Sequence, residues 1–127
     1  MSDLQEIEKL VFIGGCPRSG TTLVQNMLDS HPEVFGGPEF LHLQDIIELR
    51  RKLRWSISVG WIDTYCSHEE LDRHLRTLVR SLFTPLANSR ESRFFSEKSP
   101  MNVLVFSELI DLLPEAHFIH VVRDPRA

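Results

Sequence analysis

The chain of 127 residues is 42% hydrophobic and 25% charged, and its formal net charge is -4. This composition is that of an ordinary globular protein and excludes a disordered or fibrous one, and the length predicts a single domain over residues 1–127. The negative charge argues against a nucleic-acid partner, and no apolar run approaches the roughly 20 residues that cross a bilayer, so no membrane span is expected.

The cysteines and the N-terminal residues indicate the cellular compartment in which the protein is expected. Cys16 and Cys66 form neither a CxxC pair nor a disulfide framework. The acidic residues 2–6 do not resemble a signal peptide. We therefore expect a reduced, cytoplasmic protein.

The first third of the chain predicts a strand, a glycine loop, a helix and a second strand. Residues 10–14, Leu-Val-Phe-Ile-Gly, form a continuous apolar run typical of a strand buried on both faces of a parallel sheet. Apolar residues then recur at helical spacing from Leu23 to Leu28, until Pro32 interrupts the pattern. A short strand is expected over residues 33–37, where a glycine-proline turn follows.

Two helices are predicted in the middle of the chain. The first has an apolar stripe over residues 43–53, and residues 55–64 after it lack a period. These residues are expected to form a loop whose two tryptophans act as a lid or pocket wall. The second helix begins at a capping box made by Ser67 and Glu70, and its apolar stripe continues to about Pro85.

A strand, a helix and a strand are predicted for the last third. Residues 94–96 read as a strand, and Ser99 and Pro100 provide an N-cap and a first-turn proline for a helix that ends at Pro114. Residues 117–122 form the last buried strand, and because no helix follows it, apolar sheet surface or an edge is expected to be exposed. The alternation predicts an α/β fold with a mainly parallel sheet.

Residues 15–22, Gly-Cys-Pro-Arg-Ser-Gly-Thr-Thr, have the spacing of a phosphate-binding loop between a strand and a helix. Gly15 and Gly20 let backbone amides turn inward while the helix N-terminus faces an anion; a plain strand-to-helix turn is the alternative. Thr21 stands where a triphosphate-binding loop has its lysine, which weakens a triphosphate site. Arg18 supplies a cation instead, and its planar guanidinium can hold phosphate or sulfate oxygens.

Residues 17–23, Pro-Arg-Ser-Gly-Thr-Thr-Leu, resemble the 5′-phosphosulfate-binding motif of the sulfotransferase family, closest to its tyrosylprotein and bacterial-type branch. Residues 120–126, His-Val-Val-Arg-Asp-Pro-Arg, resemble the 3′-phosphate motif of the same family. The resemblance implies a P-loop NTPase-like, three-layer fold that binds 3′-phosphoadenylyl sulfate (PAPS), the sulfuryl donor. The donor-binding residues it implies are Pro17, Arg18, Ser19, Gly20, Thr21, Thr22 and Arg123.

Arg18 and Arg123 are expected to face one crevice from neighbouring strands, because ligands of open α/β sheets gather at the carboxyl ends of the strands. Arg18 is also placed in the catalytic set, as a cation for the transferring group. The alternative for Arg123 is an ion pair with Asp124. The six histidines and two cysteines show no zinc-type ligand spacing, and the transfer scheme needs no metal, so none is expected.

Glu39 follows the second predicted strand, where a carboxylate can project into the crevice. A glutamate similarly placed in the tyrosylprotein branch is the base, so we predict this role for Glu39; a carboxylate that only stabilises a helix start is the alternative. His31 and His42 are rival bases, since cytosolic members use histidine. Lys98 lies in a segment that resembles the Lys-Ser-Pro of the family and is predicted to reach the bridging oxygen as the sulfuryl group leaves, the alternative being a solvated lysine beside Glu97.

The sequence therefore predicts the N-terminal, donor-binding part of a sulfotransferase domain that transfers a sulfuryl group from PAPS to a hydroxyl or amine acceptor. Family catalytic domains are longer, so we expect an incomplete fold and leave open whether this chain is active alone. Nucleotide binding without turnover and a P-loop small-molecule kinase are the alternatives, and the missing lysine disfavours the kinase.

Overall fold

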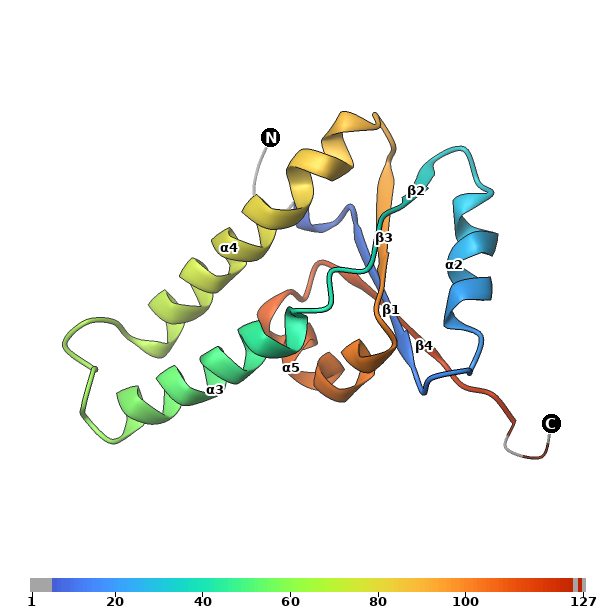
Figure 1. Cartoon of the computed structure of the whole chain (residues 1–127). Helices are drawn as coiled ribbons and strands as arrows, with labels where there is room; N and C mark the ends of the chain where they lie inside the picture. The colour runs from blue at the N-terminus through green and yellow to red at the C-terminus, as the bar shows by residue number, and fades with distance from the viewer. Residues whose placement is uncertain (1–5, 125, 127) are drawn as a thin grey trace.

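Strands and helices alternate along the chain in the predicted order (Figure 1). The structure, a computed structural model, describes residues 6–124 and 126. Its elements are, in chain order, β1 (Leu10–Gly15), α2 (Thr21–Asp29), β2 (Val34–Gly36), α3 (Leu43–Ser58), α4 (His68–Ser89), β3 (Phe94–Lys98), the 3₁₀ helix η1 (Pro100–Val105), α5 (Phe106–Leu112) and β4 (His117–Val121).

The four strands form one parallel sheet in the order β2-β3-β1-β4. Phe12 in the centre of β1 lies between Glu97 of β3 and Phe118 of β4, and Phe35 of β2 lies beside Phe95 of β3. The prediction of an α/β fold with a mainly parallel sheet is thereby confirmed. Because every strand runs in the same direction, all four carboxyl ends lie at one edge of the sheet.

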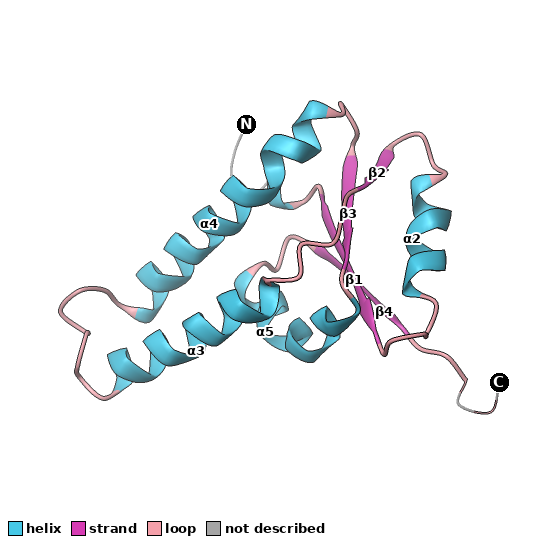
Figure 2. Ribbon diagram, in the orientation of Figure 1, coloured by secondary structure: helices cyan, strands magenta, loops and turns pink. Residues whose placement is uncertain are grey.

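Helices cover both faces of the sheet, which gives the predicted three layers (Figure 2). Among the described residues, α2 is the helix on one face, and α3, α4, η1 and α5 lie on the other (Figure 1). The Phe12 ring points to this second face, since its centroid is 5.6 Å from that of Phe83 in α4. It is also 5.7 Å from the centroid of Phe118 in β4. Burial of these apolar faces drives the layers together.

A buried ion pair joins α3 to α4. Arg50, only 7% exposed, donates from Nε and Nη2 to the two carboxylate oxygens of Asp72 over 2.8 and 3.0 Å. This hydrogen bond raises the pKa of Arg50 against the opposing effect of burial. Burial alone would raise the pKa of Asp72, but the hydrogen bonds from Arg50 and the nearby charges of Arg54 and Arg76 hold it below its ordinary value.

Two helix boundaries differ from the prediction. Helix α3 continues to Ser58, so Trp55 is helical and the expectation of a loop from residue 55 was wrong there. Helix α4 continues through Pro85 to Ser89 rather than ending at the proline. The last turn of α4 buries Ala87, only 2% exposed, against the core, and this packing offsets the backbone hydrogen bond that proline cannot make.

The capping predictions had two outcomes. The box at the start of α4 is confirmed, because the Glu70 amide donates to Ser67 Oγ over 3.1 Å and the Ser67 amide donates to Glu70 Oε1 over 3.3 Å. Ser99 occupies the predicted N-cap position with Pro100 in the first turn, but its side chain makes no capping hydrogen bond. The Ser99 hydroxyl is engaged by Glu97 instead, and the chain after it begins as the 3₁₀ helix η1.

Strand β4 lies at an edge of the sheet, as expected. Beside it is a hollow of about 930 Å³ whose lining includes Val11, Met27, Ile110 and Ile119. The expectation that apolar sheet surface is left uncovered at the last strand is therefore confirmed for the described residues.

Candidate functional site

The carboxyl edge of the sheet gathers the residues predicted to be functional. The phosphate loop, residues 15–20, follows β1; Glu39 follows β2; Lys98 ends β3; and Arg123 follows β4. Because neighbouring strands are hydrogen bonded in register, Ile13 of β1 lies beside Lys98, and Gly15 lies beside Val121. Segments far apart in sequence thus meet at one edge.

The phosphate loop turns tightly and requires its first glycine. A Cβ atom on Gly15 would lie 2.5 Å from the carbonyl oxygen of Val121 and 2.7 Å from Ser19 Oγ, which no side chain can tolerate. Gly20 has φ +100°, a left-handed conformation that glycine adopts without steric strain. Arg18 adopts φ +67°, a strained value for a non-glycine residue and one that clusters at ligand-binding sites.

The start of α2 is left open for an anion. Its N-cap residue, Gly20, offers no side chain to the first-turn amides, and that turn contains no acidic residue. Ser19 Oγ is buried and has no hydrogen-bond partner among the described residues. Thr21 is buried beneath the loop, and Thr22 is exposed. An orphaned hydroxyl beside an uncapped helix N-terminus fits the phosphate end of a nucleotide, since such an anion would satisfy both.

The two predicted arginines come together across β1 and β4. Arg123 Nη1 donates to the carbonyl oxygen of Arg18 over 3.4 Å. An open cavity of about 420 Å³ lies at the ends of these strands, and it is lined by Cys16, Pro17, Arg18, Ser19, His120, Val121, Val122, Arg123 and Asp124. The expectation that Arg18 and Arg123 face one crevice is therefore met by the geometry.

Asp124 does not pair with Arg123 in the structure. Its carboxylate accepts from the backbone amide of Arg126 over 2.9 Å and from the Arg126 guanidinium. These bonds, the backbone one first, lower the pKa of Asp124. The alternative interpretation of Arg123, as the salt-bridge partner of Asp124, was wrong because Arg126 holds that carboxylate.

Glu39 and Lys98 form an ion pair, with Lys98 Nζ donating to Glu39 Oε1. The Lys98 side chain is 10% exposed and the Glu39 side chain 41%, so the carboxylate lies toward solvent with the ammonium beneath it. The alternative of a solvated lysine beside Glu97 was wrong, since successive strand residues point to opposite faces. Glu39 is also no helix-start carboxylate: that place in α3 is taken by Asp45.

The rival bases lie differently. His31 follows the far end of α2, a helix length away from the phosphate loop, and its Nδ1 accepts from the Glu33 amide. His42 precedes α3, where its Nδ1 lies 2.8 Å from Asp45 Oδ2. The structure therefore brings Glu39, and not His31, to the edge that holds the phosphate loop.

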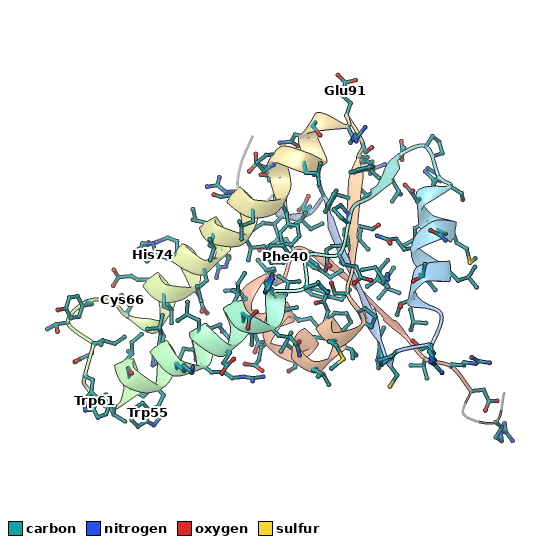
Figure 3. The ribbon with its side chains drawn as sticks, in the orientation of Figure 1. Phe40, Trp55, Trp61, Cys66, His74 and Glu91 are labelled. Carbon is teal, nitrogen blue, oxygen red and sulfur yellow. The ribbon has the colours of Figure 1, made fainter. Side chains whose placement is uncertain are left out.

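Some predicted features stay apart from this site. Trp55 and Trp61 pack edge to face at the free end of the α3–α4 hairpin, away from the sheet, so they form no lid or wall of the cavity (Figure 3). Glu39 and Lys98 do not line that cavity either. They form a second group beside it, at the ends of β2 and β3.

Sequence reasoning missed four residues at this edge. Cys16 and His120 line the cavity, and Glu97 and Asn102 form a buried hydrogen-bonded pair beside Lys98. A carboxylate two residues after Phe95, on the core-facing side of a strand, was the available signal for Glu97. In the parts of the chain that the structure describes, no three His, Cys, Asp or Glu side chains are placed to hold a metal, and no helix has the length and apolarity to cross a membrane.

The parallel sheet, the glycine loop and the helix that starts there define a P-loop-like, three-layer α/β protein. Comparison with known families narrows this class: the profile of the "Sulfotransferase family" matches residues 11–127. The chain belongs to the sulfotransferase family.

Curated relatives agree with this assignment. The chain is 32% identical over 122 residues to protein-tyrosine sulfotransferase 1 of Danio rerio and to that of Homo sapiens, and 34% identical over 132 residues to the protein-tyrosine sulfotransferase of Drosophila melanogaster. Each comparison covers 93% of this chain. It covers 33%, 32% and 24% of the zebrafish, human and fly proteins, respectively, so the chain spans about a third or less of their length.

Proposed function

We propose that the protein acts in sulfuryl transfer from PAPS to an acceptor hydroxyl or amine. The observation that carries the proposal is the open start of α2, where the Ser19 hydroxyl is buried without a hydrogen-bond partner among the described residues and the first-turn amides have no side-chain cap. Arg18 adds a cation to the loop while Thr21 occupies the place of the triphosphate-binding lysine. Membership of the sulfotransferase family supports the proposal that this anion is the phosphosulfate of the donor.

The residues that line the cavity would bind different parts of the donor. The loop amides and the hydroxyls of Ser19, Thr21 and Thr22 would hold the 5′ phosphate, and Arg18 would offset its charge. Arg123, at the neighbouring strand end, would hold the 3′ phosphate. When bound, PAPS supplies the sulfuryl group and departs as adenosine 3′,5′-bisphosphate.

Glu39 would accept the proton released in the transfer, and Lys98 would stabilise the negative charge on the leaving oxygen. The ion pair engages Glu39 Oε1, so Oε2 can accept the proton of the acceptor as the new sulfur–oxygen bond forms. Lys98 holds Glu39 in place before the transfer. Its ammonium can then donate to the oxygen from which the sulfuryl group departs, as the old sulfur–oxygen bond breaks.

The relatives supply the acceptor to test first. They are named protein-tyrosine sulfotransferases, so we propose a tyrosine side chain of a peptide or protein as the acceptor. Nucleotide binding without turnover is the second candidate function, since the cavity can hold a nucleotide whether or not transfer follows.

Donor binding is tested by titrating the chain with adenosine 3′,5′-bisphosphate and with ATP plus magnesium, using calorimetry. Tryptophan fluorescence is unsuitable, because both tryptophans lie away from the cavity. The bisphosphate is expected to bind more tightly, and Arg18→Ala is expected to weaken it by about 10- to 100-fold, as for loss of a charge-assisted hydrogen bond. Tighter binding of ATP with magnesium would contradict the proposal.

Arg93→Ala is the matched control for Arg18→Ala. Arg93 is an exposed arginine paired with Glu33 at the opposite edge of the sheet, so its loss should leave bisphosphate binding unchanged. Turnover is tested by transfer of labelled sulfate from PAPS to a tyrosine peptide. Glu39→Gln should lower kcat by about 100-fold or more while bisphosphate binding is kept, because only the base is lost.

A further inference from the structure

The segment that carries Glu39 is not part of the β2 strand. The Gly37 amide still donates to the Ser96 carbonyl over 2.9 Å, but beyond it the backbone ladder stops. The amides of Phe40 and Leu41 instead donate to side chains at the end of β3 and just after it. Phe40 donates to Glu97 Oε2 over 3.0 Å, and Leu41 donates to Ser99 Oγ over 3.3 Å. Side-chain acceptors thus replace strand pairing on the C-terminal side of Glu39.

Glu97 is at the centre of this arrangement. It is 1% exposed, and its Oε2 also accepts from the Ser99 hydroxyl, while Oε1 accepts from the Asn102 amide over 2.6 Å. Ser99 and Asn102 are themselves 3% and 2% exposed. A carboxylate that is this deeply buried and receives three donors holds its partners in fixed positions, because any of them left unpaired would be costly.

The last two residues of β3 hold this segment from opposite sides. Alternation along the strand directs Lys98 to one face, where it pairs with Glu39, and Glu97 to the other, where it binds the next amide along, that of Phe40. The Phe40 ring is anchored on Phe83 of α4 at a centroid distance of 4.8 Å and lies between α3 and the sheet (Figure 3). Contacts on both faces of β3 therefore fix the segment that carries Glu39.

The backbone at Leu41 shows that this conformation is imposed. Leu41 has φ +70° although the residue is 60% exposed, so its own packing does not explain the left-handed value. Such strain persists where surrounding contacts over-determine it, and here the contacts are the bonds from the Phe40 and Leu41 amides.

We propose that Glu97 is a positioning residue, whose buried carboxylate fixes the Phe40 amide and thereby holds Glu39 against Lys98 in the geometry needed for proton transfer. This inference rests on the proposed function. It differs from a purely structural role in that losing the contact slows the chemical step without weakening donor binding.

Two substitutions of Glu97 separate the contact from the charge. In Glu97→Gln, Asn102 can rotate its amide to accept from the new side chain, so one oxygen stays available to Phe40. In Glu97→Met the volume is kept but every acceptor is lost. We expect Glu97→Met to lower kcat by about 10- to 100-fold, the effect of roughly 1 Å of misplacement, with the dissociation constant of adenosine 3′,5′-bisphosphate unchanged. Glu97→Gln should keep most of the wild-type kcat.

Amide hydrogen exchange reports the contact without turnover. Phe40 and Leu41 should lose protection in Glu97→Met and keep it in Glu97→Gln. If Glu97→Met does not fold, Ser99→Ala is used instead, because it removes only the hydroxyl and should act in the same direction. Thr84→Val is the control: this buried hydroxyl donates to the Arg80 carbonyl within α4, so its loss removes a polar group away from Glu39.

The outcomes distinguish the two proposals. Unchanged kcat, or unchanged Phe40 protection, in the folded Glu97→Met variant would overturn the positioning role. So would an equal fall in kcat for Thr84→Val, or a loss of bisphosphate binding that matches the loss of kcat. A wild-type protein that binds the bisphosphate but transfers no sulfate would instead contradict the proposed function, and the exchange measurement would still decide whether Glu97 fixes the segment.

Discussion

Breaking the buried Arg50–Asp72 pair between α3 and α4 is predicted to cost more stability than breaking a surface ion pair. Exposed pairs contribute about 0–1 kcal/mol, whereas removing one partner of a buried pair costs about 3–5 kcal/mol. Both side chains are largely buried here, 8% and 14% exposed, but each keeps weaker charged neighbours, such as Arg54 at 3.7 Å from Asp72. We therefore expect Arg50→Met and Asp72→Leu each to lower the free energy of unfolding by about 2–3 kcal/mol.

Thermal unfolding followed by circular dichroism measures this loss. About 3–5 °C per kcal/mol is expected for a domain of this size, so each single variant should melt roughly 6–15 °C below the wild type. The double variant is the control. Replacing both partners by apolar side chains leaves no buried charge unpaired, so its melting temperature should recover most of the way.

The same pair predicts a pH dependence. The pKa of Asp72 is lower in the folded protein than its unfolded value of about 3.9, so the pair stabilises fully above about pH 4. That contribution is lost as the pH falls through the folded pKa, and wild type and Asp72→Leu should then converge in stability. A loss below about 0.5 kcal/mol at pH 7, or a loss equal at pH 7 and pH 3, would refute the reasoning.

Three further substitutions test the site and its scaffold. Gly15→Ala places a Cβ atom 2.5 Å from the Val121 carbonyl oxygen, so we expect about 1–3 kcal/mol lower stability and weaker bisphosphate binding by calorimetry; wild-type values for both would show that the loop can relax. Lys98→Met keeps the buried volume but removes the cation from Glu39, so kcat for sulfate transfer should fall by about 100-fold, and normal turnover would remove Lys98 from the mechanism. Ser67→Ala breaks the capping box, which should cost about 1 kcal/mol in thermal unfolding and leave bisphosphate binding unchanged; weaker binding would show that the hairpin communicates with the cavity.

The elements could be predicted because their signals are local. The apolar run of β1, the capping box at Ser67 and the stripe of α4 depend on neighbouring residues alone, and each appears where expected. The strand order β2-β3-β1-β4 could not be derived in the same way, because it depends on which strands pair across long loops. The end of α4 was misjudged for a related reason: burial of Ala87 outweighs the local effect of Pro85.

The sequence predicted that the candidate residues lie at the carboxyl ends of the strands, but it did not predict their contacts. The phosphate loop is a contiguous motif, so Arg18 could be singled out as the cation within the loop, and Ser19 from the resemblance of residues 17–23 to the family motif. The burial of Lys98 and its pairing with Glu39 join residues 59 apart in the chain, and no local pattern contains that information. Glu97 was passed over because a carboxylate in a strand is expected to be exposed until the partners that donate hydrogen bonds to it, such as Asn102, are known.

Sheet order rather than chain order divides the site into two halves. Strands β1 and β4 are neighbours and bring the phosphate loop and Arg123 to one side, whereas β2 and β3 are neighbours and bring Glu39 and Lys98 to the other. The halves meet where Ile13 of β1 lies beside Lys98. If the proposed function holds, the sulfuryl group must cross from the phosphate half to the carboxylate half at this β1–β3 junction. Lys98 is the residue at that boundary, and this position gives a physical reason for a buried lysine there: it contacts Glu39 on one side and lies next to the strand that leads into the phosphate loop on the other.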